Sequence, residues 1–192
     1  MSSSKPAVLV VHNNTAHPAR LRFRCDKHLL WDAWVAADGS VDVPDPGQAC
    51  IAGQALFTDP GTAVRYTHPF ELPLWCARLA LSMVAREGLV RLQFDVDNSV
   101  PCGEIRLVND TGAAVEFALH ALHTPFAFSS RVAAYSAAEL LLADITMTVT
   151  LDGITTEPVR PGTWAGHWTI HTSRLHSSAF PTFKRSQGGG WN

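Results

Sequence analysis

A repeated sequence pattern is the feature of this chain that most constrains its fold. The pattern of Val8–Cys25 (VLVVHNNTAHPARLRFRC) returns in Glu104–Leu122 (EIRLVNDTGAAVEFALHAL), and alignment of Thr15 with Thr111 places one Asn-x-Thr motif on the other. Each copy is an apolar run, a polar turn and an alternating run, which is typical of two antiparallel strands joined by a tight turn. The sequence therefore predicts an all-β chain built from two degenerate repeats of about 96 residues.

Turn signals continue this pattern along the rest of the chain. Asp45-Pro46-Gly47 and Asp59-Pro60-Gly61 separate short apolar runs, and Asp152-Gly153 lies between two further runs. Short strands at such intervals are typical of sandwiches and barrels. We therefore predict an antiparallel β-sandwich, or a two-part sandwich or barrel.

The predicted domain boundaries follow the repeats. The repeats form either two domains or one fused domain, because a local pattern does not decide which strands pair. The predicted segments are a disordered tail at 1–6, a first β repeat at 7–100, a second β repeat at 103–180 and a flexible Gly-rich tail at 181–192.

The segment Leu72–Arg86 fits two secondary structures. Its apolar residues recur at helical spacing, with a proline near the start and a glycine beyond the end. A hairpin with Glu87-Gly88 as its loop instead pairs Met83 with Leu92 and sorts the apolar residues of both strands onto one face. Because a single register sorts both strands, we favour the hairpin, with a helical turn at Leu72–Ala77 as an option.

Charge and hydropathy exclude several function classes. The chain has 15 basic and 17 acidic residues, a formal net charge of −2 and no charged blocks, so no nucleic-acid partner is expected. No apolar run approaches the roughly 18 residues of a transmembrane helix, so no such segment is expected. The first residues lack the cleavage site of a signal peptide, which predicts a cytoplasmic site of synthesis, with leaderless export as an alternative.

Neither the cysteines nor the histidines have the spacing of a metal or redox site. The chain has four cysteines, Cys25, Cys50, Cys76 and Cys102, without a Cys-x-x-Cys motif, and we predict that they are reduced and unpaired. His167 and His171 would lie on one face of a strand about 13 Å apart, which is too far to share one metal. Catalytic motifs such as Gly-x-Ser-x-Gly are absent from the sequence. We expect no metal, no cofactor and no enzymatic activity.

A row of arginines marks one face of the predicted strand Ala19–Cys25. Arg20, Arg22 and Arg24 alternate with apolar residues, so the two sets point to opposite faces. Three guanidinium groups on one strand are a candidate site for an anionic ligand, although an ordinary solvated edge has the same pattern. The corresponding positions of the second repeat hold Glu116, Ala118 and His120. The second repeat therefore does not share the arginine row.

The aromatic residues supply the other candidate site. The chain has six Trp and nine Phe but only two Tyr, and several of these rings lie near predicted turns. Apolar rings beside polar groups can form the floor of a sugar site or a membrane-facing surface, whereas a tryptophan that fills a β core is the alternative in each case. The candidate ligand-binding residues are Trp31, Asp32, Trp34, Asp38, Trp164 and Trp168. We expect Trp34 to form the platform, because it precedes the predicted turn Ala37–Ser40, and the two aspartates to accept hydroxyl groups.

The order of an apolar strand, an Asn-x-Thr motif and an alternating strand resembles the opening of small bacterial and fungal β-sandwich proteins. These include aegerolysin-like and actinoporin-like membrane-binding proteins and some lectins. The resemblance covers only this opening and assigns a role to no residue. We predict a non-enzymatic β-sandwich binding protein that recognises a carbohydrate or membrane surface through loops rich in aromatic residues. The alternative is a membrane-active protein of the pore-forming or toxin-like kind, and either could form a homo-oligomer.

Overall fold

The protein is all-β. The computed structural model describes residues 8–86, 89–98, 100–162, 164, 166–175 and 178–186. The elements up to Asp97 are β1 (Val8–Asn13), β2 (Ala19–Cys25), β3 (His28–Val35), β4 (Ser40–Pro44), η1 (Pro46–Gln48), β5 (Ile51–Thr58), β6 (Arg65–Leu72), β7 (Cys76–Arg86) and β8 (Leu89–Asp97). The later elements are β9 (Glu104–Asp110), β10 (Val115–Ala121), β11 (Ala127–Val132), β12 (Ser136–Leu141), η2 (Leu142–Asp144), β13 (Ile145–Leu151), β14 (Ile154–Thr155), β15 (Gly166–Leu175) and β16 (Ser178–Ser186).

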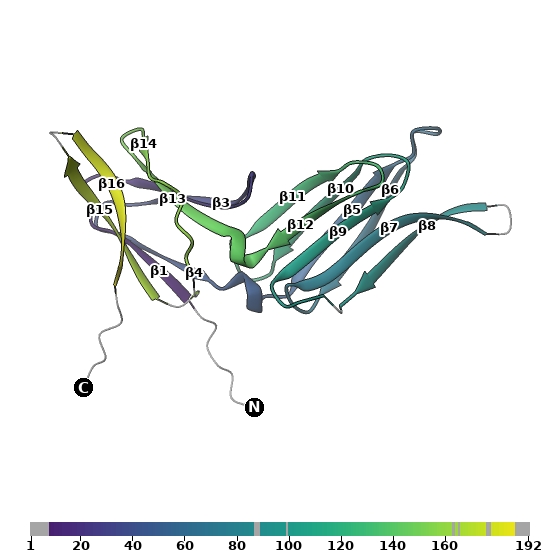
Figure 1. Ribbon diagram of the computed structural model, residues 1–192, viewed down its shortest axis with the longest axis horizontal. Coiled ribbons are helices and arrows are strands. Elements are labelled where there is room, and N and C mark those ends of the chain that lie inside the picture. Colours follow the sequence, from purple (N-terminus) through teal and green to yellow (C-terminus); the bar gives the residue numbers. More distant parts are fainter. Residues whose placement is uncertain are drawn as a thin grey trace, which may run out of the picture. The chain divides into compact units, whose positions relative to one another are not determined.

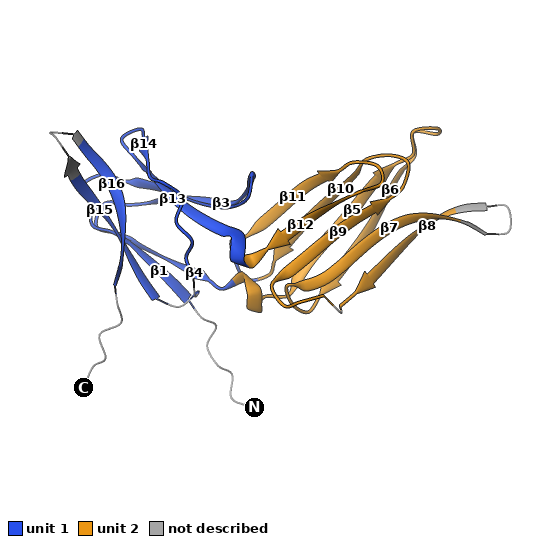
Figure 2. Cartoon of the chain, viewed as in Figure 1, with its two compact units in different colours: residues 1–45, 123–125, 143–192 blue, residues 46–122, 126–142 orange. Residues whose placement is uncertain are grey.

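The strands form four sheets in two compact units (Figures 1 and 2). Unit 1 comprises residues 1–45, 123–125 and 143–192, and unit 2 comprises 46–122 and 126–142. Unit 1 contains sheet A, in the order β16-β15-β1-β4, and sheet B, in the order β14-β13-β2-β3. Unit 2 contains sheet C, in the order β11-β10-β5-β6, and sheet D, in the order β12-β9-β7-β8. Among the described residues, no helix is long and apolar enough to span a bilayer.

Alternating side chains build the core of each unit. In β2, Leu21 and Phe23 are fully buried while the arginines between them are partly exposed, and Phe117 is fully buried in β10. Successive side chains of a strand point to opposite faces, so each sheet presents an apolar face to the core. The predicted all-β, sandwich-type fold is confirmed.

The segment that fitted both a helix and a hairpin is a hairpin. Strands β7 and β8 pair with Met83 opposite Leu92 and Leu81 opposite Phe94, which is the predicted register. The predicted loop Glu87-Gly88 lies outside the described residues. The optional helical turn is absent, because residues 73–75 form bends between β6 and β7.

The predicted flexible tail begins too early. Residues 181–186 belong to β16, which pairs along its whole length with β15. Pro181, which donates no backbone hydrogen bond, lies within this strand. It is tolerated because β16 is the edge strand of sheet A, where a missing donor can face away from the sheet. The predicted tail at 1–6 and residues 187–192 lie outside the described residues.

Both Asn-x-Thr motifs form the same buried corner. Asn13 and Asn109 are fully buried, and the side-chain amide of each donates hydrogen bonds to three backbone carbonyls. The acceptors are His17, Val35 and Ala36 at 2.9, 3.1 and 3.0 Å for the first, and Ala113, Val132 and Ala133 at 2.7, 3.0 and 2.9 Å for the second. Each corner therefore fastens a strand-joining turn to the end of another strand: the β1/β2 turn to the end of β3, and the β9/β10 turn to the end of β11.

The threonines complete these corners. The Thr15 hydroxyl donates to the Asn13 side-chain oxygen at 2.8 Å, and Thr111 donates to Asn109 at 2.6 Å. The bonded oxygen holds the amide in one orientation, so that its N–H groups face the carbonyls. The motifs match the glycosylation sequon only formally, because these asparagine side chains are buried and already bonded.

The predicted repeats and the compact units divide the chain differently. Strands β1–β4 lie in one unit with β13–β16, and β5–β8 lie in the other with β9–β12. The boundaries 7–100 and 103–180 therefore do not coincide with the units, and each unit takes strands from both segments. The strand orders of the two units nevertheless correspond when the strand numbers are shifted by eight. Sheet A, β16-β15-β1-β4, becomes β8-β7-β9-β12, which is sheet D in reverse order. Sheet B becomes sheet C in the same way.

Candidate functional site

The outward face of sheet B brings together residues from both candidate sites of the sequence analysis. Strand β2 lies between β13 and β3, with Arg20 opposite Trp34 and Arg22 opposite Asp32. Residues that pair across neighbouring strands project on the same side of a sheet. We call this surface the arginine face; its residues are Arg20, Arg22, Arg24, Asp32, Trp34, Thr146, Thr148 and Thr150.

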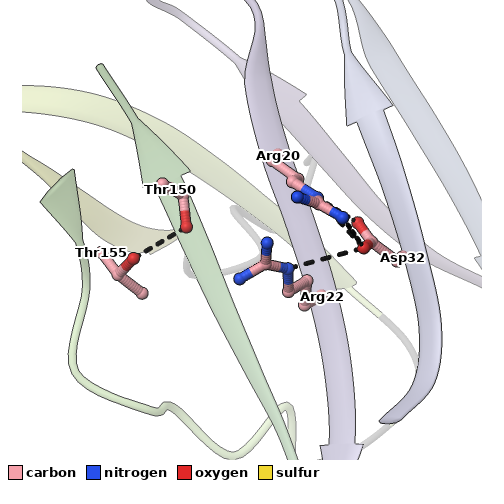
Figure 3. A network of polar contacts seen from close by, with 5 residues as sticks. All are labelled: Arg20, Arg22, Asp32, Thr150 and Thr155. Atoms are coloured by element: carbon pink, nitrogen blue, oxygen red, sulfur yellow. Dashed lines mark hydrogen bonds and ion pairs between the residues drawn. The ribbon is translucent and has the colours of Figure 1, made fainter. Parts of the chain in front are cut away.

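The Asp32 carboxylate forms ion pairs with two of the three arginines. Arg20 Nε donates hydrogen bonds to both Asp32 oxygens, at 2.8 and 3.0 Å, and its Nη2 also contacts Oδ2 (Figure 3). Arg22 Nε lies 3.5 Å from the same Oδ2. The hydrogen bonds from Arg20 lower the pKa of Asp32, so this aspartate is ionised at neutral pH.

The arginine face carries excess positive charge. Among the described residues, Arg24 makes no ion pair. Three guanidinium groups therefore face one carboxylate, that of Asp32. The Asp32 bonds fix the plane of Arg20, while Arg22 and Arg24 keep donors available for an anion.

An exposed ring lies beside these cations. Trp34 is 66% exposed, and Arg20 Cζ lies 6.0 Å from its ring centroid, within the range of a cation–π contact. On the other side of β2 a hydroxyl pair connects β13 to β14, with Thr150 Oγ1 and Thr155 Oγ1 2.8 Å apart (Figure 3). The face thus combines an apolar ring, cationic donors and neutral hydroxyl groups.

The remaining predicted ligand-binding residues lie elsewhere. Trp31 and Trp164 stack on Phe23, with ring centroids 5.7 and 5.8 Å away, so they lie on the inward side of sheet B. Asp38 lies in the turn between β3 and β4 with a positive φ of 52°. Neither the two rings nor this aspartate joins the arginine face.

Trp168, another of the predicted ligand-binding residues, is part of the core. It is only 8% exposed, and its ring makes an edge contact with Phe183 at 6.1 Å. The alternation of β15 already indicates this, because Trp168 and Ile170 share one face of the strand while His167, Thr169 and His171 share the other.

Three of the four cysteines lie in unit 2. Cys25, in unit 1, is buried, whereas Cys50 and Cys102 are exposed, and Cys50, Cys76 and Cys102 form no disulfide. Burial, followed by the neighbouring Cys102, raises the pKa of the Cys76 thiol. In the part of the chain that the structure describes, no group of three or more His, Cys, Asp or Glu side chains could hold a metal ion.

Unit 2 contains a cleft that the sequence analysis missed. It has a volume of about 610 Å³ and lies between β6 and β8, the edge strands of sheets C and D. Its lining residues are Ala55, Phe57, Asp59, Tyr66, Thr67, His68, Leu81, Met83, Arg91, Leu92 and Phe94. Phe57 and Leu81 are each 2% exposed, whereas Tyr66 and Met83 are 46% and 43% exposed. The cleft therefore has a buried apolar floor and accessible walls.

Aromatic stacking shapes the walls of this cleft. The Phe94 ring stacks on His68 at 4.5 Å and on Phe70 at 5.2 Å. The Asp59 side chain accepts hydrogen bonds from Thr62 Oγ1 at 2.7 Å and from the Gly61 amide at 2.9 Å, and these bonds lower its pKa. The sequence analysis did not identify the cleft, although Tyr66, His68 and Phe70 alternate in the sequence of β6.

Comparisons of the chain with models of protein families, with curated proteins and with solved structures find no match. Geometry and chemistry alone therefore carry the functional argument.

Proposed function

We propose that the protein is a non-enzymatic β-sandwich binding protein that recognises an anionic carbohydrate through the arginine face. The observation that carries this proposal is the register that sets the arginine row beside an exposed tryptophan. A pyranose ring packs its C–H face on an indole, while a carboxylate or sulfate substituent accepts hydrogen bonds from guanidinium groups. The threonine hydroxyls beside β2 match sugar hydroxyls.

The charge balance favours an anionic sugar over a neutral one. Asp32 is held by Arg20 and Arg22 and has little capacity left to accept sugar hydroxyls. Arg24 and one side of Arg22 remain as the donors, and their planar forks match the geometry of carboxylate and sulfate. The overall formal charge of −2 argues against a general polyanion site such as a nucleic-acid surface.

The test is binding of a sulfated oligosaccharide and its desulfated form, measured by titration calorimetry. We expect Arg24→Ala to weaken binding of the sulfated form at least about tenfold, because a hydrogen bond to a charged group contributes about 1.5–3 kcal/mol. Trp34→Ala should weaken it about twofold to tenfold, because ring stacking contributes about 0.5–1.5 kcal/mol. The matched control is Arg131→Ala, an exposed arginine on the outward face of sheet C. Equal binding of both sugar forms, or equal losses in all three variants, would refute the proposal.

A second candidate function is binding of an apolar small molecule, such as a single acyl chain, in the cleft of unit 2. What supports it is the volume of about 610 Å³, which lies within the range of small-molecule sites, together with the buried floor of Phe57 and Leu81. This candidate keeps the lipid partner of the sequence analysis but uses a cleft in place of loops. The membrane-active alternative requires in addition that the protein make liposomes leak.

A fluorescent fatty acid tests the cleft. Met83→Lys should weaken its binding at least tenfold, because a charged group would enter the apolar site. Val84→Lys is the matched control, since Val84 is also exposed on β7 but does not line the cleft. Equal binding to both variants would exclude the cleft as the site.

A further inference from the structure

Unit 1 and unit 2 have the same strand order but are connected differently. Unit 2 is formed by 46–142 apart from residues 123–125, whereas unit 1 combines strands before Pro46 with strands after Asp144 (Figure 2). We call β1–β4 the leading half of unit 1 and β13–β16 its trailing half. In unit 2 the corresponding halves, β9–β12 and β5–β8, are joined directly by residues 98–103. In unit 1 the chain runs from the leading to the trailing half only by way of unit 2.

Two central ladders hold the halves of unit 1 together. Strand β1 pairs in parallel with β15, and β2 pairs antiparallel with β13. In the second ladder Leu21 lies opposite Val149 and Phe23 opposite Met147, and all four side chains are fully buried. Separation of the halves would expose these apolar faces and two open strand edges on each half, and such an edge is the surface on which a β-strand from another chain docks.

The same hydrogen bonds and packing can form within one chain or between two. The trailing half of a second copy offers β15 to β1 and β13 to β2, just as the trailing half of the same chain does. Exchange of an identical element between copies costs little, because no contact of the closed unit is lost. Only the local concentration of the tethered half favours closure within one chain.

We infer that the leading half of unit 1 is a docking surface for the trailing half of a second copy of this chain. Reciprocal exchange gives a closed dimer, and exchange that does not close gives a longer head-to-tail assembly. Unit 2 is the matched contrast, because the join at 98–103 keeps its two halves together. The inference does not depend on the arginine face or on the cleft.

Complementary lesions test this inference in the full chain. Leu21→Asp damages the leading half of one variant, and Val149→Asp damages the trailing half of another; these residues are partners in the β2/β13 ladder. Neither variant can build unit 1 alone, but a mixture holds one intact half of each kind. Mixing after joint refolding should give a one-to-one dimer of about twice 20.8 kDa by native mass spectrometry.

The controls distinguish exchange from general stickiness. Each variant refolded alone should give no dimer. A mixture of two differently tagged chains that both carry Leu21→Asp should also give none. Dimers in these controls, or none in the complementary mixture, would overturn the inference.

The unmodified chain provides a second measurement that needs no lesion. Two differently tagged copies, unfolded together and refolded at rising concentration, should co-purify in a fraction that increases at least tenfold over a hundredfold rise in concentration. Absence of mixed-tag species at every concentration would overturn the inference, even where the lesion variants aggregate.

Discussion

The outward faces of sheets B and C lie at corresponding places in the strand orders of the two units but carry different side chains. In sheet B the central strand β2 presents arginines beside the exposed Trp34, whereas in sheet C the central strand β10 presents Glu116, Ala118 and His120. The inward positions of both strands are apolar and buried. Packing constrains the inward positions of a sandwich strand, while its outward positions are free to differ with the ligand.

The cores of the two units also differ at one corresponding pair. In unit 2, Gly53 lies opposite Phe70 on β6, and a Cβ atom at Gly53 would lie 2.5 Å from the Phe70 ring. In unit 1 the corresponding position of β13 is Met147, which is bridged to Val159. Unit 2 thus uses an absent side chain and a large ring where unit 1 uses a long side chain and a small one. The Phe70 ring then supports Phe94 in the cleft wall.

Two tryptophans, one in each unit, should give the largest contrast. Trp75 is 4% exposed and its Nε1 donates to the Leu140 carbonyl at 3.3 Å, while Trp34 is 66% exposed. Trp75→Ala should lower the free energy of unfolding by about 3–5 kcal/mol, because it leaves a cavity and an unpaired acceptor. Trp34→Ala should change it by less than about 1 kcal/mol. Denaturant melts of both variants check this, and a large loss in Trp34→Ala would remove Trp34 from the ligand site.

The buried corners test how far the two units are alike. Asn13→Ala and Asn109→Ala should each cost about 2–4 kcal/mol, because each leaves three carbonyls without their donor in the protein interior. Asn14→Ala is the matched control, since the Asn14 side chain is exposed and lies 3.5 Å from His171 Nδ1, and the substitution keeps the backbone hydrogen bond from Asn14 to the Ile170 carbonyl. Denaturant unfolding followed by tryptophan fluorescence measures all three. Unequal losses in the two corner variants would show that one corner is less important than their shared geometry indicates.

Local patterns in the sequence predicted most of the strands and one hairpin register. Alternation in Ala19–Cys25 placed Leu21 and Phe23 inward, and the β7/β8 register followed because it sorted two strands at once. Partners distant in the sequence could not be predicted in this way. The parallel pairs β1/β15 and β7/β9 join strands whose local patterns are compatible with many neighbours.

The candidate site was predictable as residues but not as a surface. The arginine row and Trp34 were each identified, yet their contact depends on the β2/β3 register, which shifts at a bulge between Phe23 and Arg24. The role of Asp32 also changed, from an expected acceptor of sugar hydroxyls to the carboxylate that orients Arg20. A side chain that packs against a ring of another strand gives no signal of its own in the sequence, so Phe94 could not be assigned to the cleft.

The Gly53 position tests the difference between the two cores. Gly53→Ala should cost about 1–3 kcal/mol, because the new methyl group would collide with the Phe70 ring and with the Ala118 carbonyl 2.8 Å away. In Phe70→Leu the smaller side chain should relieve part of this collision, so the double variant should lose less than the sum of the single losses. Denaturant melts of the four proteins give this coupling. Additive losses would mean that the ring does not occupy the space above Gly53.

The smallest expected effect concerns Asp32. Its substitution tests whether the positive charge of the arginine face, which the outward face of sheet C lacks, determines binding. Asp32→Asn should strengthen binding of the sulfated oligosaccharide by about twofold to fivefold, as expected for removal of one partly exposed competing charge. Its stability should fall slightly at neutral pH. The folded-state pKa of Asp32 is lowered, so its contribution is present above the unfolded value of about 3.9 and is lost as the pH falls through the folded value.

The stability difference between Asp32→Asn and the unmodified chain should therefore disappear in acid, which melts from neutral pH to about pH 2 would show. Glu116→Gln on the outward face of sheet C is the matched control, because it removes one carboxylate from β10, the counterpart of β2, without touching Arg20, Arg22 or Arg24. Stronger sugar binding in both variants would indicate a general effect of net charge. Weaker binding in Asp32→Asn alone would mean that orientation of Arg20 matters more to the ligand than the charge that Asp32 neutralises.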